Sequence, residues 1–223
     1  ICLSIPADAA GTYTEPGSNI SSQYWSNPVK CHTISNADGS VTIMYSVWNG
    51  SQQILYIDRF SSAGARLSHK GVAVPGKAWG GTVYRGPDGC NYIATGNGAD
   101  AAYYISKYSA DWNLIRTTAI GQEESYTNTA YRSSNSDMTM VGDYLIVHAG
   151  RGRLDGHQSN TTFVINKNTM QAVYVTGAFG TDHVSHSFSQ FIRSDGNQVL
   201  MVDHGDAYPR EIVFQTYQMD SSG

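Results

Sequence analysis

The sequence predicts an all-β protein, a β-propeller with four visible four-stranded blades. Three observations favour this fold class. Tight-turn dipeptides recur about 50 residues apart along the chain. Short alternating or apolar runs flank each dipeptide, and no stretch follows a helical period. A β-sandwich would also supply short strands, but sandwiches do not usually repeat internally at a fixed spacing.

The repeated dipeptides predict hairpins, because Asp-Gly and Asn-Gly supply the positive φ angles that type I′ turns need. They are Asp38-Gly39, Asp88-Gly89, Gly142-Asp143 and Asp195-Gly196. Second strands are predicted after the turns at 41–48, 91–95, 144–148 and 198–203. After a loop rich in Gly and Asn, third strands are predicted at 54–60, 102–108, 162–166 and 211–217. Fourth strands are predicted only at 66–74, 114–120 and 170–176.

These units place the blades at 29–76, 77–122, 123–178 and 179–223, the last of them incomplete. Residues 1–9 look like the remnant of a secretory signal peptide, an apolar run followed by a small-x-small site; an ordinary apolar strand is the alternative. For residues 10–28 the sequence predicts a loop with one strand that could close the ring. Because the last blade is incomplete and no initiator Met is present, we expect a fragment of a larger ring.

Composition and charge exclude some classes of function. Charged residues make up only 14% of the chain, and the formal net charge is −4, so the basic surface of a nucleic-acid-binding protein is missing. No apolar run reaches the roughly 18 residues of a membrane-spanning helix. If Cys2 leaves with the signal peptide, Cys31 and Cys90 remain. Their predicted places at opposite ends of neighbouring hairpins argue against a disulfide. We expect an exported protein, extracellular or at the cell surface.

Ionisable side chains gather on one predicted face of the propeller. The loops between second and third strands and the loops between blades emerge on the same face, opposite the Asp-Gly turns. Five of the seven histidines fall on or beside such loops in the last two units. The candidate ligand-binding residues are His148, Arg151, Arg153, His157, His183, His186, Asp203, His204, Asp206 and Arg210.

Three interpretations of this cluster stay open. In the first, the side chains only tie down long loops by hydrogen bonding to backbone groups. In the second, they form a ligand face where aromatic rings stack on sugar rings; the stacking candidates are Trp48, Trp79, Tyr126 and Tyr208. In the third, they form a metal or catalytic centre.

A metal centre would use His183, His186, Asp203, His204 and Asp206. The odd spacing of His183 and His186 at the head of a strand puts their rings on opposite faces, which weakens a shared coordination shell. The string Asp203-His204-Gly205-Asp206 is similar to part of a calcium loop, but the closing Glu is absent. We predict no cofactor, with calcium or another divalent ion as the open alternative. No carboxylate pair stands out, so the catalytic residues stay unassigned.

Three strings carry a resemblance to a known group of proteins. They are DGHQSN at 155–160, VSHSFSQF at 184–191 and DHGDAYPR at 203–210. Together they resemble secreted bacterial propeller-like proteins that occur at the cell surface beside wall-anchoring modules. The match covers mainly residues 143–217. The resemblance implies an extracellular propeller and carries over no activity.

The sequence therefore predicts an extracellular or cell-surface binding module whose partner is a polysaccharide or surface glycan, bound through the His/Asp/Arg-rich face. The alternative is a secreted polysaccharide-active hydrolase or lyase that uses the same face, with His as base. A second alternative is a structural surface domain.

Overall fold

The structure is a computed structural model that describes residues 31–48, 51–74, 78–97, 101–131, 134–206 and 210–220. The predicted signal remnant at 1–9 and the loop at 10–28 lie outside these ranges. The described chain is all-β, with its strands in four antiparallel sheets. It divides into two compact units, one that ends at Val74 and one that follows it, and each is described by itself.

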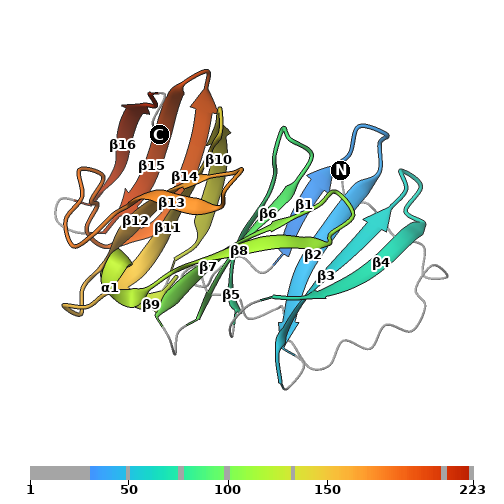
Figure 1. The fold of residues 1–223 in the computed structure, drawn as a ribbon, viewed down its shortest axis with the longest axis horizontal. Helices are drawn as coiled ribbons and strands as arrows, with labels where there is room; N and C mark the ends of the chain where they lie inside the picture. Colours follow the sequence, from blue (N-terminus) through green and yellow to red (C-terminus); the bar gives the residue numbers. More distant parts are fainter. Residues whose placement is uncertain are drawn as a thin grey trace. The chain divides into compact units, whose positions relative to one another are not determined.

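The first unit contains one sheet whose strands pair in chain order (Figure 1). The strands are β1 (Cys31–Ser35), β2 (Val41–Trp48), β3 (Gln53–Phe60) and β4 (Arg66–Ala73). Met44, Leu55 and Ile57 alternate with more exposed neighbours, which is the pattern of strands with one buried face.

The second unit contains three sheets (Figure 1). The first is β5 (Ala78–Arg85), β6 (Asn91–Asn97), β7 (Ala102–Tyr108) and β8 (Leu114–Ile120). After the short helix α1 (Gln122–Ser125), the second is β9 (Thr127–Ala130), β10 (Ser136–Val141), β11 (Tyr144–Arg153), β12 (Gln158–Asn166) and β13 (Gln171–Val175). The third is β14 (Ser187–Asp195), β15 (Gln198–Gly205) and β16 (Glu211–Gln218). Within the described residues, α1 is the one helix, and it is not long or apolar enough to cross a membrane.

The four predicted hairpin turns are present, but they are not the predicted type I′ turns. Only the glycine of each turn has a positive φ, at 79° for Gly39, 76° for Gly89, 57° for Gly142 and 59° for Gly196. At the last two, the strand partners directly flank a two-residue turn that begins with glycine. The neighbouring Asp instead caps the loop: the Asp38 carboxylate accepts hydrogen bonds from the main-chain N–H and the hydroxyl of Ser40.

In the structure, most of one predicted loop belongs to two paired strands. The sequence predicts that residues 149–160 join two strands, yet β11 continues through Arg153 and β12 starts at Gln158. Gly150 pairs with Asn160 and Arg151 with Ser159, and β9 adds a further strand along Arg151. The glycines and small polar residues favour a loop locally, but pairing on both sides supplies the backbone hydrogen bonds that make this segment a strand.

The sheets of the second unit pack on one another through two different interfaces. Between β5–β8 and β9–β13 the core is apolar, with Ile105, Ile120, Met138, Leu145 and Phe163 fully buried. Between β9–β13 and β14–β16 an apolar cluster fills only part of the contact; it contains Val141, Ile146, Val164, Ile192, Val199 and Met201. The remainder of this second interface is polar. We call it the polar junction, and it consists of His148, Asn160, Thr162, Thr176, Asp182, Ser187, Gln190 and Asp203.

Both cysteines in the described ranges, Cys31 and Cys90, are free thiols.

Candidate functional site

Three segments meet at one edge of the second unit, next to the polar junction. The tip of the β11–β12 hairpin, the segment 176–186 and the end of β15 are joined by main-chain hydrogen bonds. The His186 N–H donates to the Gln158 carbonyl at 2.8 Å, and the Asp206 N–H donates to the His186 carbonyl at 3.0 Å. We call this edge the rim and define it as residues 153–158, 176–186 and 206. It brings together chain segments that are far apart in the sequence.

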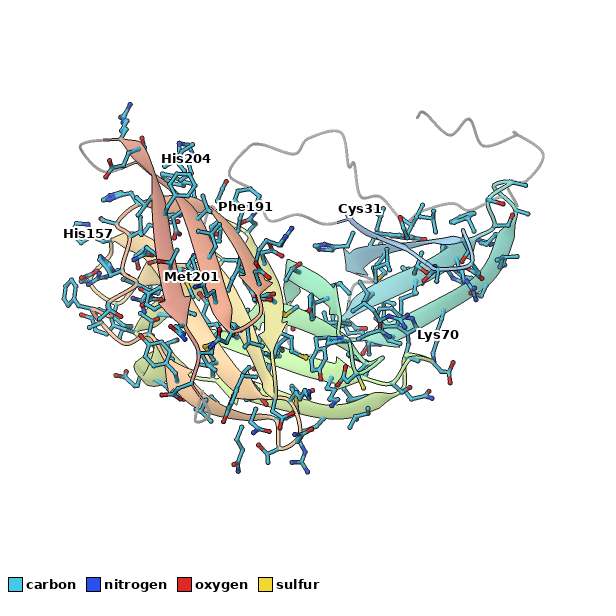
Figure 2. The ribbon with its side chains drawn as sticks, turned by 90° about the horizontal axis from the view of Figure 1, so that it is seen from above. Cys31, Lys70, His157, Phe191, Met201 and His204 are labelled. Carbon is cyan, nitrogen blue, oxygen red and sulfur yellow. The ribbon has the colours of Figure 1, made fainter. Side chains whose placement is uncertain are left out.

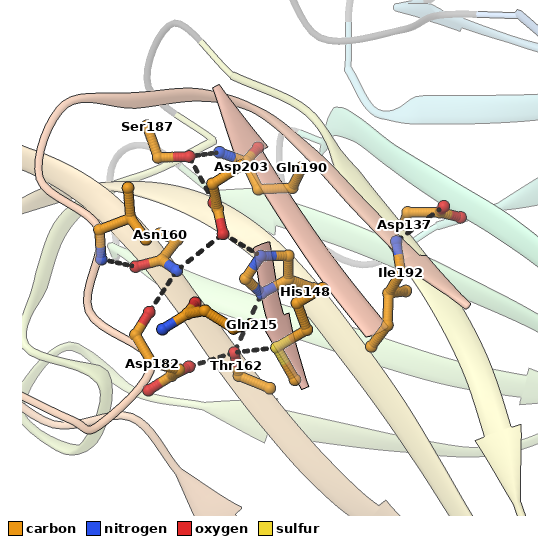
Figure 3. A network of polar contacts seen from close by, with 12 residues as sticks. Asp137, His148, Asn160, Thr162, Asp182, Ser187, Gln190, Ile192, Asp203 and Gln215 are labelled. Atoms are coloured by element: carbon orange, nitrogen blue, oxygen red, sulfur yellow. Dashed lines mark hydrogen bonds and ion pairs between the residues drawn. The ribbon is translucent and has the colours of Figure 1, made fainter. Parts of the chain in front are cut away.

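The polar junction is centred on the fully buried carboxylate of Asp203 in β15 (Figure 3). His148 Nε2 of β11 donates to Asp203 Oδ2 at 2.9 Å, and Ser187 Oγ of β14 donates to Oδ1 at 2.6 Å. Asn160 Nδ2 of β12 adds a longer contact of 3.3 Å to Oδ2. A single carboxylate therefore links strands from two sheets, and no side chain of this group reaches solvent.

A second buried carboxylate, Asp182, lies on the other side of Thr162. The Thr162 hydroxyl contacts both His148 Nδ1, at 3.0 Å, and Asp182 Oδ2. Thr176 Oγ1 lies 3.0 and 2.9 Å from the two oxygens of Asp182. Figure 3 shows this chain of contacts running from Asp203 through His148 and Thr162 to Asp182. Buried polar groups that are hydrogen-bonded in this way favour one geometry, because each lost bond leaves a desolvated group.

The polar junction fixes the backbone of the rim. Asn160 Oδ1 accepts the Val184 N–H at 2.8 Å, and Asn160 Nδ2 donates to the Asp182 carbonyl at 2.5 Å. Its main-chain N–H donates to the Val184 carbonyl at 3.2 Å. One side chain thus clamps residues 182–184 in place, and the first interpretation, in which polar side chains tie down loops, describes these residues.

Arg151 is also part of the support below the rim. Its guanidinium is fully buried; Nε donates to Ser159 Oγ at 3.0 Å, and Nη1 donates to the carbonyls of Ser125 and Thr176. Burial lowers the pKa of Arg151 from its usual value. Because these three donors are used inside the protein, Arg151 braces α1 and the segment 176–186 against β11.

At the rim, an exposed aromatic ring packs on a guanidinium group. Arg153 donates to both oxygens of Asp155, at 3.1 and 2.7 Å, and its guanidinium carbon lies 4.3 Å from the ring centroid of Phe179. The ring centroid of Tyr126 lies 5.5 Å from the same guanidinium carbon. Phe179 nevertheless keeps 75% of its surface exposed. Such an exposed ring, held by a cation, is a pre-positioned stacking surface.

Three histidines lie at the rim, and one of them contacts this ring. The His183 ring contacts Phe179 edge-on, with centroids 5.4 Å apart, and its Nε2 lies 3.2 Å from Arg153 Nη1. Burial, with added repulsion from Arg153, lowers the pKa of His183, so the imidazole is neutral at pH 7. The rings of His157 and His186 contact each other at 6.0 Å. His186 and Tyr126 both have positive φ, 54° and 51°, which for side chains of this size is a strained backbone.

The structure divides the ten predicted residues into three groups. Five lie at the rim, namely Arg153, His157, His183, His186 and Asp206, of which Arg153 is itself buried, and three lie buried beneath it, namely His148, Arg151 and Asp203. His204 is exposed on the opposite face of β15 from Asp203, and Figure 2 labels it together with His157. Asp206 forms an exposed ion pair of 2.7 Å with Arg210. Ligand binding by these residues stays a prediction; the buried three contribute as supports.

The metal interpretation gains no support from geometry. In the part of the chain that the structure describes, no three His, Cys, Asp or Glu side chains gather where they could hold a metal ion. His183 and His186 contact different partners, Arg153 and His157, but both precede β14, so the strand-face argument from their odd spacing does not apply to them. Of the four stacking candidates, Tyr126 contacts Arg153 of the rim; Tyr208 and the side chains of Trp48 and Trp79 fall outside the described residues.

Sequence reasoning missed Phe179 and most of the polar junction. Phe179 is one aromatic residue in the Gly-rich stretch Gly177–Gly180, and only the distant Arg153 gives it a role. The sequence assigns Asn160 to a loop and Thr162 to the start of a strand. Their two-residue spacing, which puts both on one face of β12, is the signal that could have found them.

No protein-family model matches the sequence, and no curated protein matches it. Among solved structures, the chain is similar to an endo-arabinase from Bacteroides thetaiotaomicron, with a TM-score of 0.55, 11% identity, and coverage of 86% of this chain and 75% of that one. It is also similar to a GH32 β-fructofuranosidase from Bombyx mori (TM-score 0.48, 10% identity, 78% of this chain, 42% of that chain). The β-propeller domain of the Trilobed protease from Pyrococcus furiosus is a further match (TM-score 0.44, 6% identity, 86% and 58%).

The chain therefore spans three quarters of the arabinase and less than two thirds of the other two proteins. At such low identities, the likeness concerns the fold alone. The chain is all-β, and its four antiparallel sheets match β-propeller structures over most of its length, as the sequence predicted.

Proposed function

We propose that this chain is an extracellular or cell-surface carbohydrate-binding β-propeller that contacts a polysaccharide or surface glycan through the rim. The observation that carries the proposal is the Phe179 ring, 75% exposed yet held 4.3 Å above the Arg153 guanidinium. An exposed phenylalanine in a disordered loop has no preferred ligand. A fixed ring offers the flat apolar surface on which the C–H face of a sugar packs.

The groups around the ring suit sugar hydroxyls. Because the His183 pKa is lowered by burial, its neutral imidazole has one donor and one acceptor nitrogen. His157 is exposed beside His186, and both rings carry nitrogen atoms that can hydrogen-bond to a ligand. Arg153 already donates to both oxygens of Asp155, so it supports the platform and adds no large net charge. We therefore expect a neutral or weakly charged glycan.

The contrast between the two sheet interfaces supports this location. The interface of β5–β8 with β9–β13 is an apolar core, which shows that packing alone suffices to join sheets in this chain. The polar junction instead carries two buried carboxylates and a buried histidine directly below the rim. Such networks specify one geometry at a cost in desolvation, and a binding site gains from that rigidity.

The endo-arabinase is named for action on a carbohydrate, and propeller glycosidases of this kind make carbohydrate a reasonable ligand class for the rim. The enzyme alternative draws on His157 and His186, whose accessible rings could act as a base in a lyase. Hydrolysis by a carboxylate pair has less support, because Asp203 is fully buried and only 2% of the Asp182 surface is exposed.

The test is a panel of wall and plant polysaccharides incubated with the protein, with retained protein and released fragments assayed together by mass spectrometry. Retention without fragments is expected. Phe179→Ala should weaken retention about tenfold or more, since a sugar would lose the apolar contact of one ring. The matched control is Leu114→Ala, which removes an apolar side chain that is 57% exposed on β8. Equal retention by both variants would move the site away from the rim.

Released fragments would put the enzyme alternative first. In that case His157→Ala separates the two classes of function. A binder should lose a few-fold in affinity, whereas an enzyme that uses His157 as its base should lose about 100-fold or more in rate. Neither retention nor fragments across the panel would contradict the carbohydrate proposal and leave the structural surface domain.

A further inference from the structure

A separate pocket of about 210 Å³ lies between the edge strands β13 and β16, beside the apolar half of the sheet interface. Its walls include Val164 and Met201, and the rings of Tyr174 and Tyr217 belong to its lining. The Asp182 carboxylate of the polar junction also lines it. The pocket therefore combines an apolar body, two aromatic rings and a buried anion. It shares no lining residue with Arg153, Phe179 or the histidines of the rim.

Charge decides what this pocket can accept. Its described lining holds two carboxylates, Asp182 and Asp220, and no lysine, arginine or histidine. Asp182 is only 2% exposed, and within the described chain its carboxylate contacts the hydroxyl groups of Thr162, Thr176 and Tyr174. None of the ion pairs among the described residues includes Asp182. A buried carboxylate normally has a cation in contact, because hydroxyl groups compensate only part of the lost hydration.

The Asp182 carboxylate gives the pocket a negative potential. Burial raises the pKa of Tyr174 and of Tyr217, the Asp182 charge raises both further, and the Arg151 charge lowers that of Tyr174. A neutral sugar gains little from such a potential, and an anionic one is repelled. A compact inorganic cation would need several oxygen ligands, and no cluster of three His, Cys, Asp or Glu side chains exists among the described residues. An alkylated ammonium fits all three features, since its carbon atoms pack on Val164 and Met201 while its charge faces the rings and Asp182.

We propose that the pocket between β13 and β16 binds a small organic cation, an ammonium group that carries alkyl substituents. Tyr174 and Tyr217 supply the faces of the aromatic rings, Asp182 supplies the counter-charge, and Met201 forms part of the apolar wall. The pocket shares Thr181 and Asp182 with the rim segment 176–186 but none of the side chains proposed to contact a glycan, so the protein would bind two ligands of different chemistry.

The test compares choline with 3,3-dimethylbutan-1-ol, its neutral carbon isostere, by isothermal titration calorimetry on the whole chain. The proposal predicts that choline binds at least about tenfold more tightly than the isostere, the range expected for a cation over desolvated rings beside a carboxylate. Equal binding of the two probes would show an apolar cavity without charge selection and overturn the proposal. No binding of either probe would overturn it as well.

Two variants assign the binding to the pocket. Tyr174→Leu removes one ring at a partly exposed position and should weaken choline binding about fivefold or more. Its control is Val173→Leu, the neighbouring residue on β13, which does not line the pocket and is 48% exposed. Should Tyr174→Leu fail to fold, Asp220→Asn removes a lining carboxylate near the end of the described chain and should also weaken choline binding. If the choline affinity is unchanged in the variants that fold, the site lies elsewhere and the proposal is overturned.

Discussion

Replacing Asp203 with alanine should lower the free energy of unfolding of the second unit by about 3–5 kcal/mol, because the change strands buried hydrogen-bond donors. This range follows from the three donors that would be stranded. His148 Nε2 at 2.9 Å, Ser187 Oγ at 2.6 Å and Asn160 Nδ2 at 3.3 Å all point at this carboxylate, and all are buried. An unsatisfied buried donor costs about 1–3 kcal/mol, so the donors alone account for the expected loss.

The assay is urea denaturation followed by circular dichroism, with Asp206→Ala as the matched control. Asp206 lies three residues further along, and its partner Arg210 is exposed, so this ion pair should contribute about 0–1 kcal/mol. A double-mutant cycle between Asp203 and His148 should give a coupling of about 0.5–3 kcal/mol. If Asp203→Ala destabilises the protein no more than Asp206→Ala does, the polar junction does not hold the two sheets together and our interpretation of it is wrong.

Two further predictions concern the rim and its support. The lowered pKa of His183 means that its stabilising neutral form is complete above the ordinary value of 6.5 and is lost as the pH falls from there towards the folded-state pKa. An NMR titration should give a midpoint below 6.5, and Arg153→Gln should raise it; a wild-type midpoint at or above 6.5 would contradict the burial argument. At Gly150, an added Cβ would lie 2.0 Å from Ser134 Oγ, so Gly150→Ala should lower the free energy of unfolding by about 1–3 kcal/mol. The control is Gly177→Ala, which has open space around it and should change the free energy of unfolding by no more than about 0.5 kcal/mol. Equal effects of the two glycine variants in urea denaturation would argue against this close packing.

The fold was accessible from the sequence because its signals are local. Turn glycines and alternating apolar residues act over a few positions, and the strands 41–48, 102–108 and 114–120 have the bounds predicted for them. The hairpin that extends to residue 153 was missed, because Gly150, Gly152 and their small polar partners form strands only when β9 and β12 pair with them. Such pairing is a long-range effect that local propensity does not contain.

The candidate site could be predicted only in part, for a related reason. Titratable residues stand out in a sequence, so Arg153, His157, His183 and His186 were identified, but which of the ten candidates are exposed and which are buried depends on how the segments pack. Asp203 and His204 are adjacent, yet one is sealed and the other is exposed. Phe179 gains its role only from a cation 26 residues earlier in the chain, a contact that no local pattern encodes.

The most direct test of the proposed function is NMR of the protein with ¹³C-labelled histidine rings. The protein is titrated with an oligosaccharide from the polysaccharide that retains it in the panel assay. Each histidine of the described chain lies in a known place: three at the rim, one in the polar junction, one on the outer face of β15 and two in the first unit. The proposal predicts that the signals of His157, His183 and His186 move together, while those of His32 and His69 stay fixed. Shifts confined to His204, His32 or His69 would contradict it and place the glycan on another surface.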